Sequence, residues 1–426
     1  MRLPPAIVGH TEEVLREILR FTAPADNTLS RYFREHPRLG GRERGVIAES
    51  IYGMLRNKAV YTSFSESGSG ALIRRMALLA LADGAGVDAL GGLSDQETEW
   101  LNRVMEMDRS HLPLALRVNL PDWLLEKLTA QLGQDGMLKF AEATNRPAPL
   151  DLRVNSMKTD RLAVQSELAL APIQAEPTPY APDGLRILKK PSLQNLPLFK
   201  SGAIEVQDEG SQLLAQIVGA KRSEMVVDFC AGAGGKTLAL GAAMRNTGRL
   251  YAFDISEKRL AKLKPRLARS GLSNVHPVLI AHERDAKIKR LAGKIDRVLV
   301  DAPCSGLGTL RRNPDVKWRQ LPGAIAELNV KQIAILDSAA RLVKAGGRLV
   351  YATCSILREE NEAIAEQFLA AHAGFELVPM RDVLAEQKIA LAMDDYLRLS
   401  PELHETDGFF AAVFQRKKIT ETNLET

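Results

Sequence analysis

Cysteine is scarce in this chain, which has 426 residues and only three thiols. Cys230, Cys304 and Cys354 are too few for a disulfide framework and lack the paired spacing of a zinc site. Long apolar runs are also missing, because Arg74 and Arg75 break the most apolar stretch, and the first residues lack the apolar core of a secretory signal. We therefore expect a protein of the reducing cytoplasm with no membrane span.

Internal repeats and low-complexity tracts are likewise missing from the sequence. Hydrophobic residues make up 45% and charged residues 26%, the balance of a folded globular protein, which excludes disorder over most of the length. At about 150 residues per domain, the length suggests about three domains.

Positive charge is unevenly distributed along the chain. The formal net charge is only +5, yet residues 245–319 carry 18 Lys and Arg against 7 Asp and Glu. A clustered positive field attracts phosphates, so the excess favours a polyanionic partner. Charge alone leaves open that these residues are solvated helix faces, as in LAKLKPRLAR.

Residues 1–149 are expected to form an all-helical region. Segments such as EEVLREILRF, GVIAESIYGMLRN and DWLLEKLTAQLG have apolar residues at spacings of three and four. Glycine-rich breaks at residues 65–72 and 84–92 predict loops between helices.

Two further domains are expected after this region. Residues 150–203 combine short extended pieces, one helical run and several prolines, which predicts a small α+β domain or linker. In residues 204–418, short β-rich runs alternate with helical stretches, the pattern of a doubly wound, Rossmann-like α/β domain.

A glycine-rich turn follows the first β-rich run of the α/β region, in MVVDFCAGAGGKTLAL. Gly232, Gly234 and Gly235 would let backbone amides approach a nucleotide-like ligand, and Asp254, nineteen residues past Gly235, could accept bonds from ribose hydroxyls. GAGGKT lacks the spacing of a P-loop, which disfavours a nucleoside triphosphate. A dinucleotide, S-adenosylmethionine and a turn without a ligand stay open at this point.

Two thiols and a carboxylate are expected at the carboxyl edge of the same sheet. Asp301 and Cys304 directly follow the apolar run RVLV, and Cys354 ends another run in GRLVYATCS. Ligand crevices of open α/β sheets lie at that edge. Cys230 is more typical of a small buried hydrophobe, whereas turns and polar neighbours follow the other two thiols.

A thiol and a carboxylate suit chemistry on a pyrimidine ring. Carbon 5 becomes nucleophilic only after a thiolate adds to carbon 6, and an acid near ring nitrogen 3 would absorb the developing charge. After an electrophilic methyl is accepted, a base must remove the carbon 5 proton before the thiolate leaves.

The chain also resembles a known family. VQDEGSQL, DFCAGAGGKT, DAPCSGLGTLRRNPDVKW, YATCSILREENE and DGFF, in this order, are similar to motifs of the Sun-type (Nol, Nop and Sun) RNA cytosine carbon-5 methyltransferases, whose bacterial members include a 16S ribosomal RNA enzyme. The resemblance covers residues 150–416. More weakly, Arg42–Asn57 resembles the NusB-like helical RNA-binding domain of many bacterial members.

The resemblance implies roles for individual residues. Cys354 is the implied nucleophile, Cys304 assists release, and Asp301 contacts the cofactor region and the target base. The implied S-adenosylmethionine contacts are Cys230, Ala231, Gly232, Ala233, Gly234, Gly235, Lys236, Asp254 and Asp301.

Two positions depart from the family pattern. Ala233 replaces the usual proline of the glycine loop, which we expect only to loosen the turn. Glu283 and Asp285 compete for the third acidic cofactor contact, and we choose Asp285 while Glu283 stays open.

Other polar residues have competing interpretations. Arg311, Arg312, Lys317 and Trp318 are expected to form a phosphate-binding and base-stacking surface in preference to an ordinary exposed loop. Gln207, Asp208 and Glu209 are expected to fix an interdomain turn. Lys236 either faces the cofactor carboxylate or simply begins a helix, and we favour the first.

We therefore expect a monomeric enzyme that methylates cytosine carbon 5 in structured RNA without a metal. Ribosomal RNA is the preferred substrate, and transfer RNA is the alternative. A DNA cytosine methyltransferase would use Pro303-Cys304 and would not need Cys354. A non-catalytic RNA-binding assembly factor would usually have lost a catalytic cysteine. A dehydrogenase is disfavoured because these motifs contain no base suited to hydride transfer.

Overall fold

The computed structural model describes residues 2–189, 191 and 193–418. The chain divides into two compact units, Met1–Pro147 with Thr309–Pro322, and Ala148–Gly308 with Gly323–Thr426. The sequence placed residues 309–322 in the α/β domain, whereas in the structure this segment packs with the helical residues.

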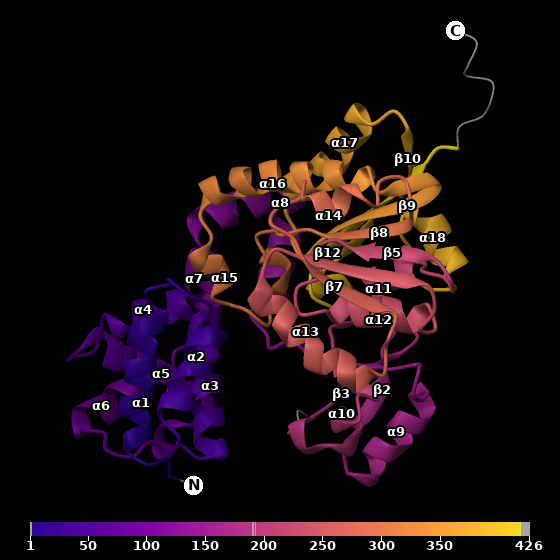
Figure 1. The fold of residues 1–426 in the computed structure, drawn as a ribbon. Coiled ribbons are helices and arrows are strands. Elements are labelled where there is room, and N and C mark those ends of the chain that lie inside the picture. Colours follow the sequence, from indigo (N-terminus) through magenta and orange to yellow (C-terminus); the bar gives the residue numbers. More distant parts are fainter. Residues whose placement is uncertain (1, 190, 192, 419–426) are drawn as a thin grey trace. The chain divides into compact units, whose positions relative to one another are not determined.

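The first unit is helical (Figure 1). Its helices are α1 (Ala6–Ile18), α2 (Ala25–Glu35), α3 (Gly41–Arg56), α4 (Lys58–Ser65), α5 (Leu72–Ala85), α6 (Asp95–Met105), α7 (Leu114–Val118), α8 (Asp122–Thr144) and α15 (Val316–Arg319). Helix α5 is the central one, because residues 76–82 are all buried and α1, α3, α4 and α6 pack around it. The loops expected near residues 65–72 and 84–92 are confirmed by the ends of α4 and α5.

The segment 309–322 is bound into this helical unit by polar and apolar contacts. The indole of Trp318 donates to the Leu55 carbonyl at 3.0 Å and packs on the helical core. The Asp315 carboxylate accepts a bond from the Ala25 amide at 3.2 Å. These contacts join residues about 260 or more positions apart, which no local sequence pattern could reveal.

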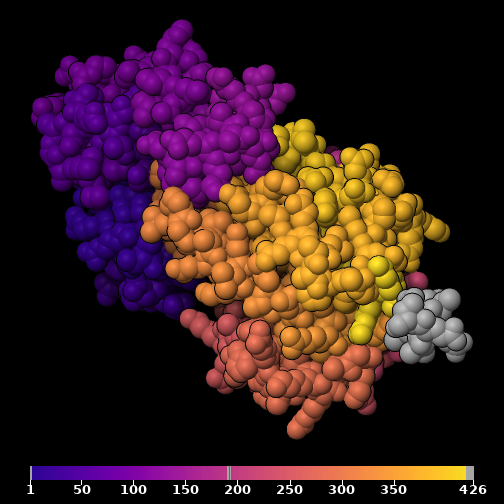
Figure 2. Space-filling view, turned by 90° about the horizontal axis from the view of Figure 1, so that it is seen from above, coloured from indigo at the N-terminus to yellow at the C-terminus, as the bar shows by residue number. Residues whose placement is uncertain are grey.

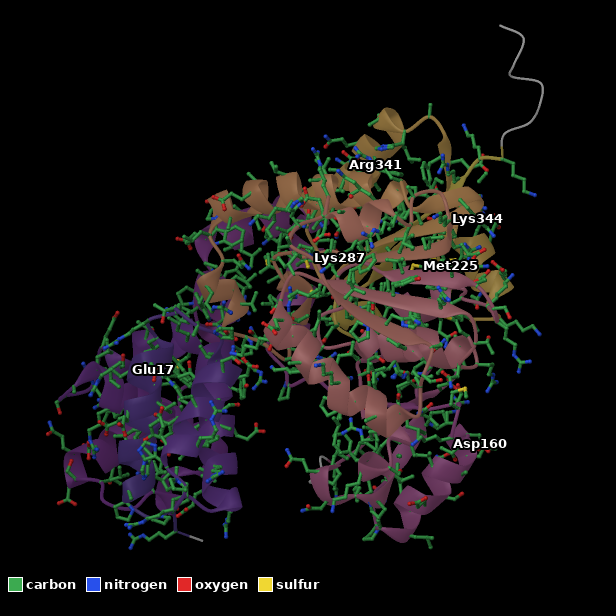
Figure 3. The ribbon with its side chains drawn as sticks, viewed as in Figure 1. Glu17, Asp160, Met225, Lys287, Arg341 and Lys344 are labelled. Atoms are coloured by element: carbon green, nitrogen blue, oxygen red, sulfur yellow. The ribbon has the colours of Figure 1, made fainter. Side chains whose placement is uncertain are left out.

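The second unit begins with a small antiparallel sheet of order β2-β3-β1-β4. Its elements are β1 (Leu150–Val154), α9 (Arg161–Leu170), β2 (Ala175–Pro177), β3 (Gly184–Ile187), α10 (Pro197–Lys200) and β4 (Ile204–Val206). Asp160, labelled in Figure 3, starts α9 by accepting a bond from the Ala163 amide at 2.9 Å. Strand β4 belongs to this sheet but lies just after residue 203, where the sequence predicted the end of the small domain.

The larger sheet has the order β10-β12-β9-β8-β5-β6-β7, with β11 paired to β12. Its strands are β5 (Met225–Asp228), β6 (Arg249–Asp254), β7 (Val275–Leu279), β8 (Ile295–Asp301), β9 (Val343–Thr353), β10 (Phe375–Val378), β11 (Leu397–Leu399) and β12 (Phe409–Arg416). Strands β5 to β9 run parallel, whereas β12 is antiparallel to β9 and to β10.

Helices cover both faces of this sheet, as the alternation of buried residues requires. Val298 and Val300 of β8 face a core shared with α14 (Ala286–Lys289), α16 (Pro322–Ala340) and α17 (Glu362–Ala371), whereas Leu299 faces the core under α11 (Glu209–Val218), α12 (Gly235–Ala243) and α18 (Met380–Glu386). Helix α13 (Glu257–Ser270) packs beside β6 and β7. Figure 2 shows orange and yellow segments, which include α16 and α17, covering the face seen from above.

The strand order reverses at β5, which lies between β6 and β8. The loops after β5 and β8 therefore leave the sheet in opposite directions and open a crevice at the carboxyl edge. Met225 and Lys344, labelled in Figure 3, lie at the opposite, amino ends of β5 and β9. The expected fold class is confirmed: a helical region, a small mixed domain and a Rossmann-like α/β domain.

Candidate active site

A cavity of about 830 Å³ lies at the carboxyl ends of β5, β6, β8 and β9. It brings together most of the residues predicted from the sequence, which come from separate motifs. The predicted residues that line it are Cys230, Ala231, Gly232, Ala233, Gly235, Lys236, Asp254, Asp301, Cys304 and Cys354.

The glycine loop between β5 and α12 forms one wall of this cavity. Gly234 has a φ of +84°, and a Cβ atom there would lie 2.1 Å from Leu263, so this position requires glycine. The Gly232 amide donates to Asp254 at 2.8 Å, and the Ala231 amide donates to the Phe253 carbonyl at 2.8 Å. The loop is therefore fastened to the end of β6 and presents its backbone to the cavity.

Asp254 is buried, with only 2% of its surface exposed. Besides Gly232, it accepts a bond from the Ser256 amide at 2.7 Å and forms an ion pair with Arg259 at 2.9 Å. The carboxylate thus organises the loop in addition to facing the cavity.

Asp228 lies beneath the glycine loop and was not singled out by the sequence. One carboxylate oxygen accepts a bond from the Thr237 hydroxyl at 2.7 Å, and the other has no hydrogen-bond partner among the described residues. Burial raises the pKa of Asp228 to about 7, which the Thr237 bond only partly opposes.

Lys236 forms an ion pair with Asp301 across the cavity floor, with Nζ 2.7 Å from a carboxylate oxygen. Burial would lower the pKa of Lys236, but the charge and hydrogen bond of Asp301 outweigh it, so this pKa is raised. Lys236 lies in the first turn of α12, and its ammonium donates a hydrogen bond to Asp301.

The two predicted thiols are in contact, with 3.3 Å between the Sγ atoms of Cys304 and Cys354. The hydrogen bond between the two thiols and burial raise the pKa of Cys304 well above its usual range. Burial also raises the pKa of Cys230.

The two candidates for the third acidic contact, Glu283 and Asp285, have different surroundings in the structure. Glu283 lines the cavity together with His282. Asp285 instead caps α14, where its two oxygens accept bonds from the Ala281 and Lys287 amides at 2.9 and 2.8 Å. Because its carboxylate is committed to its own loop, the geometry favours Glu283 in place of Asp285.

The expected RNA surface, Arg311, Arg312, Lys317 and Trp318, lies in the helical unit. Lys317 is 1% exposed and its ammonium donates to the Asn145 side chain at 3.0 Å, so in this structure it is not available to a phosphate. Trp318 is half-buried and bonded to Leu55. Lys317 and Trp318 therefore pack within the helical unit and do not form the exposed surface that the sequence predicted. Arg311 and Arg312 are half-buried.

Gln207, Asp208 and Glu209 join the two sheets of the second unit. The Gln207 side chain accepts a bond from Arg153 of β1 at 2.5 Å, and Glu209 accepts the Tyr180 and Ala181 amides at 2.6 and 2.8 Å. Asp208 caps α11. Gln207 also lines the cavity, a position that its sequence context did not reveal.

The sheet order, the glycine loop at the reversal of strand order and the acid ending β6 define a Rossmann-like methyltransferase. Comparison with known proteins agrees. Residues 215–415 match the family described as 16S rRNA methyltransferase RsmB/F, and residues 120–194 match the RsmF/B-like ferredoxin-like domain.

Individual relatives extend this match over most of the chain. A probable ribosomal RNA small subunit methyltransferase B from Synechocystis is 33% identical over 94% of this chain and 97% of its own length. The crystal structure of PH0851 has a TM-score of 0.77 and 26% identity, covering 98% of this chain and 100% of that one. A methyltransferase homologue from Pyrococcus horikoshii has a TM-score of 0.62 and 30% identity, covering 73% and 100%.

The chain therefore belongs to the RsmB/F family of 16S rRNA methyltransferases, and the Sun-type resemblance is confirmed. Within the described residues, no helix has the length and apolar character needed to cross a membrane.

Proposed function

We propose that this chain methylates carbon 5 of a cytosine in 16S ribosomal RNA, using S-adenosylmethionine and a covalent adduct of Cys354. The contact of 3.3 Å between the Cys304 and Cys354 thiols carries the proposal, because a reaction that forms and then breaks a thiol adduct uses one thiol for each step. Asp301 lines the same cavity.

The cavity fits S-adenosylmethionine through three features of its wall. The backbone of the glycine loop, which any Cβ at Gly234 would distort, allows a close approach. Asp254 suits the ribose hydroxyls, and Glu283 is a further acidic group on the wall. When bound, S-adenosylmethionine supplies an electrophilic methyl group.

The protein's own residues act on the cytosine ring in three steps. The Cys354 thiolate adds to carbon 6 and forms the sulfur–carbon bond that makes carbon 5 nucleophilic, while Asp301, held by Lys236, interacts with the nitrogen 3 side of the ring. After carbon 5 has been methylated, a base removes the carbon 5 proton, and we assign Cys304 to accept it. The electrons of that carbon–hydrogen bond form the double bond between carbons 5 and 6, while the bond from carbon 6 to Cys354 breaks and Cys354 leaves as a thiolate.

Basic residues beside the cavity support an RNA substrate. Arg259 and Arg266 of α13 line the cavity, and Lys258, Lys262 and Lys264 of the same helix are exposed. Such a strip of positive charge attracts a phosphate backbone.

Ribosomal RNA is favoured over transfer RNA by the family to which the chain belongs. A non-catalytic assembly factor is disfavoured because both thiols are present and in contact.

The proposal is tested by bisulfite sequencing of 16S rRNA from cells with and without the gene. One cytosine should lose its protection when the gene is deleted and regain it with the wild-type protein, but not with Cys354→Ala. Protection lost in a transfer RNA would transfer the activity to that substrate, and no change in any RNA would contradict the proposal.

A further inference from the structure

Glu360 is a fully buried carboxylate to which the proposed chemistry assigns no role. It ends the short helical turn Arg358–Glu360, which follows the Cys354 loop, and none of its surface is exposed. Burying a carboxylate is costly unless hydrogen bonds stabilise it, so the partners of Glu360 indicate what it is there to hold.

Those partners are the residues that follow the two thiols. One oxygen of Glu360 accepts a bond from the Ser305 amide at 2.8 Å, and the other accepts the Ser305 hydroxyl at 2.5 Å and the Ser355 hydroxyl. Ser305 follows Cys304, and Ser355 follows Cys354. The two serine hydroxyls also lie 3.1 Å apart. A single carboxylate therefore joins two loops that are 50 residues apart in the sequence.

Gln332 of α16 completes this arrangement on the side before Cys304. Its amide donates to the Pro303 carbonyl and to Glu360, both at 3.0 Å, and its side chain is fully buried. The loop carrying Cys304 is thus held at Pro303 and at Ser305.

Neighbouring groups fix Glu360 and the Cys354 loop in turn. The Tyr351 hydroxyl donates to the backbone carbonyl of Glu360 at 2.6 Å, and the Asn361 side chain donates to the Ser355 carbonyl at 3.0 Å. Oε1 of Gln332 has no hydrogen-bond partner among the described residues, but both oxygens of Glu360 are satisfied, and buried hydrogen bonds of this kind restrain the carboxylate to one geometry.

We propose that Glu360 is a positioning residue, whose carboxylate clasps the loops after Cys304 and Cys354 and holds the two thiols in contact. This inference rests on the proposed function for its catalytic consequence, although the clasp itself is independent of substrate. Two thiols that act in successive steps on one ring must both reach it, and displacing either would slow the reaction.

The charge of Glu360 has a second consequence for Cys304. The hydrogen bond with Cys354, burial and the charge of Cys354 are the larger causes of the raised pKa of the Cys304 thiol, and the negative charge of Glu360 adds to them. The other titratable groups around this thiol are Tyr351 of β9, Cys354 directly after β9, Asp301 of β8, Lys236 of α12 and Cys230 of the glycine loop. The clasp therefore helps to keep the proton on Cys304.

Two variants separate position from charge. Glu360→Gln retains an oxygen for the Ser305 amide and can donate to a serine hydroxyl, but it removes the charge. Glu360→Ala removes the clasp entirely. Glu366→Gln is the matched control. It is the same substitution at a position in α17 where the side chain is 54% exposed.

The experiment measures three properties of the full chain for each variant. They are thermal unfolding, the methylation rate on 16S rRNA, and the iodoacetamide alkylation rates of Cys304 and Cys354 as a function of pH, resolved by peptide mass spectrometry. The alkylation rates need neither RNA nor cofactor.

We expect Glu360→Ala to lower methylation by about 100-fold, as misplaced catalytic groups do, and to speed alkylation of both thiols. Glu360→Gln should retain more activity than Glu360→Ala, and the pH profile of Cys304 alkylation should move to lower pH. The control should match the wild type in all three measurements.

A folded Glu360→Ala variant with wild-type methylation and alkylation would overturn the proposal. If Glu360→Ala does not fold, Glu360→Gln decides, because an unchanged pH profile for Cys304 would also overturn it. Failure of the proposed function is a separate outcome: the wild-type protein would then methylate no 16S rRNA, while the alkylation results for the clasp would stand.

Discussion

The ammonium of Lys236 lies 2.7 Å from the carboxylate of Asp301, which ties the first turn of α12 to the end of β8. The glycine loop directly precedes α12, and the loop that carries Cys304 directly follows β8. This ion pair therefore connects the wall expected to bind the cofactor with the residues expected to act on the base.

Lys236→Met should lower both stability and methylation. Losing the charged hydrogen bond to Asp301 is expected to cost about 2 kcal/mol in the free energy of unfolding. Because the pKa of Lys236 is raised, its contribution is present at neutral pH and is lost only as the pH rises through and above the ordinary lysine range. Thermal unfolding and methylation assays test this, with Lys388→Met, at an exposed position outside the cavity, as control. An active Lys236→Met enzyme would contradict it.

Replacing each thiol by alanine should block the reaction at a different step. Cys354→Ala should abolish methylation, because carbon 5 has no nucleophilic character without the adduct. Cys304→Ala should permit addition and methyl transfer but block release, so that protein and RNA accumulate as a covalent complex. A denaturing gel with labelled RNA distinguishes them, and an adduct in Cys354→Ala that is missing in Cys304→Ala would reverse the roles.

Asp254→Asn should weaken S-adenosylmethionine binding by about 1.5 to 3 kcal/mol, the value of a hydrogen bond to a charged group. The loss has two sources, because Asp254 also holds the Gly232 amide. Calorimetry measures it, with Glu257→Gln in the exposed first turn of α13 as control. Unchanged affinity in a folded Asp254→Asn variant would remove Asp254 from the site.

Glu283 and Asp285 provide a matched pair for the third acidic contact. Glu283→Ala should reduce the affinity for S-adenosylmethionine, because Glu283 lines the cavity. Asp285→Ala should leave affinity nearly unchanged and loosen the start of α14, since its carboxylate caps that helix. Calorimetry on both variants tests the assignment, and the opposite result would restore the choice of Asp285.

Lys317→Met should stabilise the protein at neutral pH. Burial lowers the pKa of Lys317 to about 7, so between pH 7 and the ordinary lysine range the unfolded chain binds more protons and the stability of the wild type rises with pH. Met of similar length should raise the free energy of unfolding at pH 7.5 by about 1 to 3 kcal/mol and flatten this rise. RNA affinity should not change.

Thermal unfolding between pH 7 and 9.5, together with the salt dependence of RNA binding, tests the Lys317 prediction. A weaker salt dependence in Lys317→Met would show that the ammonium does reach a phosphate, as its sequence context had suggested.

Much of the α/β domain could be predicted because its determinants are local. Short apolar runs ending in Asp228, Asp254, Asp301 and Cys354 predict parallel strands, and parallel strands place those ends at one edge. The glycine loop likewise carries its own conformational requirement at Gly234.

Some residues were placed wrongly because composition does not determine exposure. Lys317 and Trp318 occur in a basic, aromatic segment typical of a nucleic-acid surface. The apolar core of the helical unit takes up Trp318, and the polar end of Asn145 meets the ammonium of Lys317. Burying the indole lowers the free energy wherever the chain can reach an apolar core, and sequence distance does not limit that gain.

The sequence by itself determined the order of the domains, the strand ends that carry Asp301, Cys304 and Cys354, and the family. Only the tertiary structure decided that Lys236 pairs with Asp301, that Glu283 faces the cavity, and that Glu360 holds both thiol loops. The physical reason is the distance along the chain over which each kind of interaction acts. Strand and turn preferences act over a few neighbouring residues, whereas a buried charge must find its partner among all the groups that folding brings within about 3 Å.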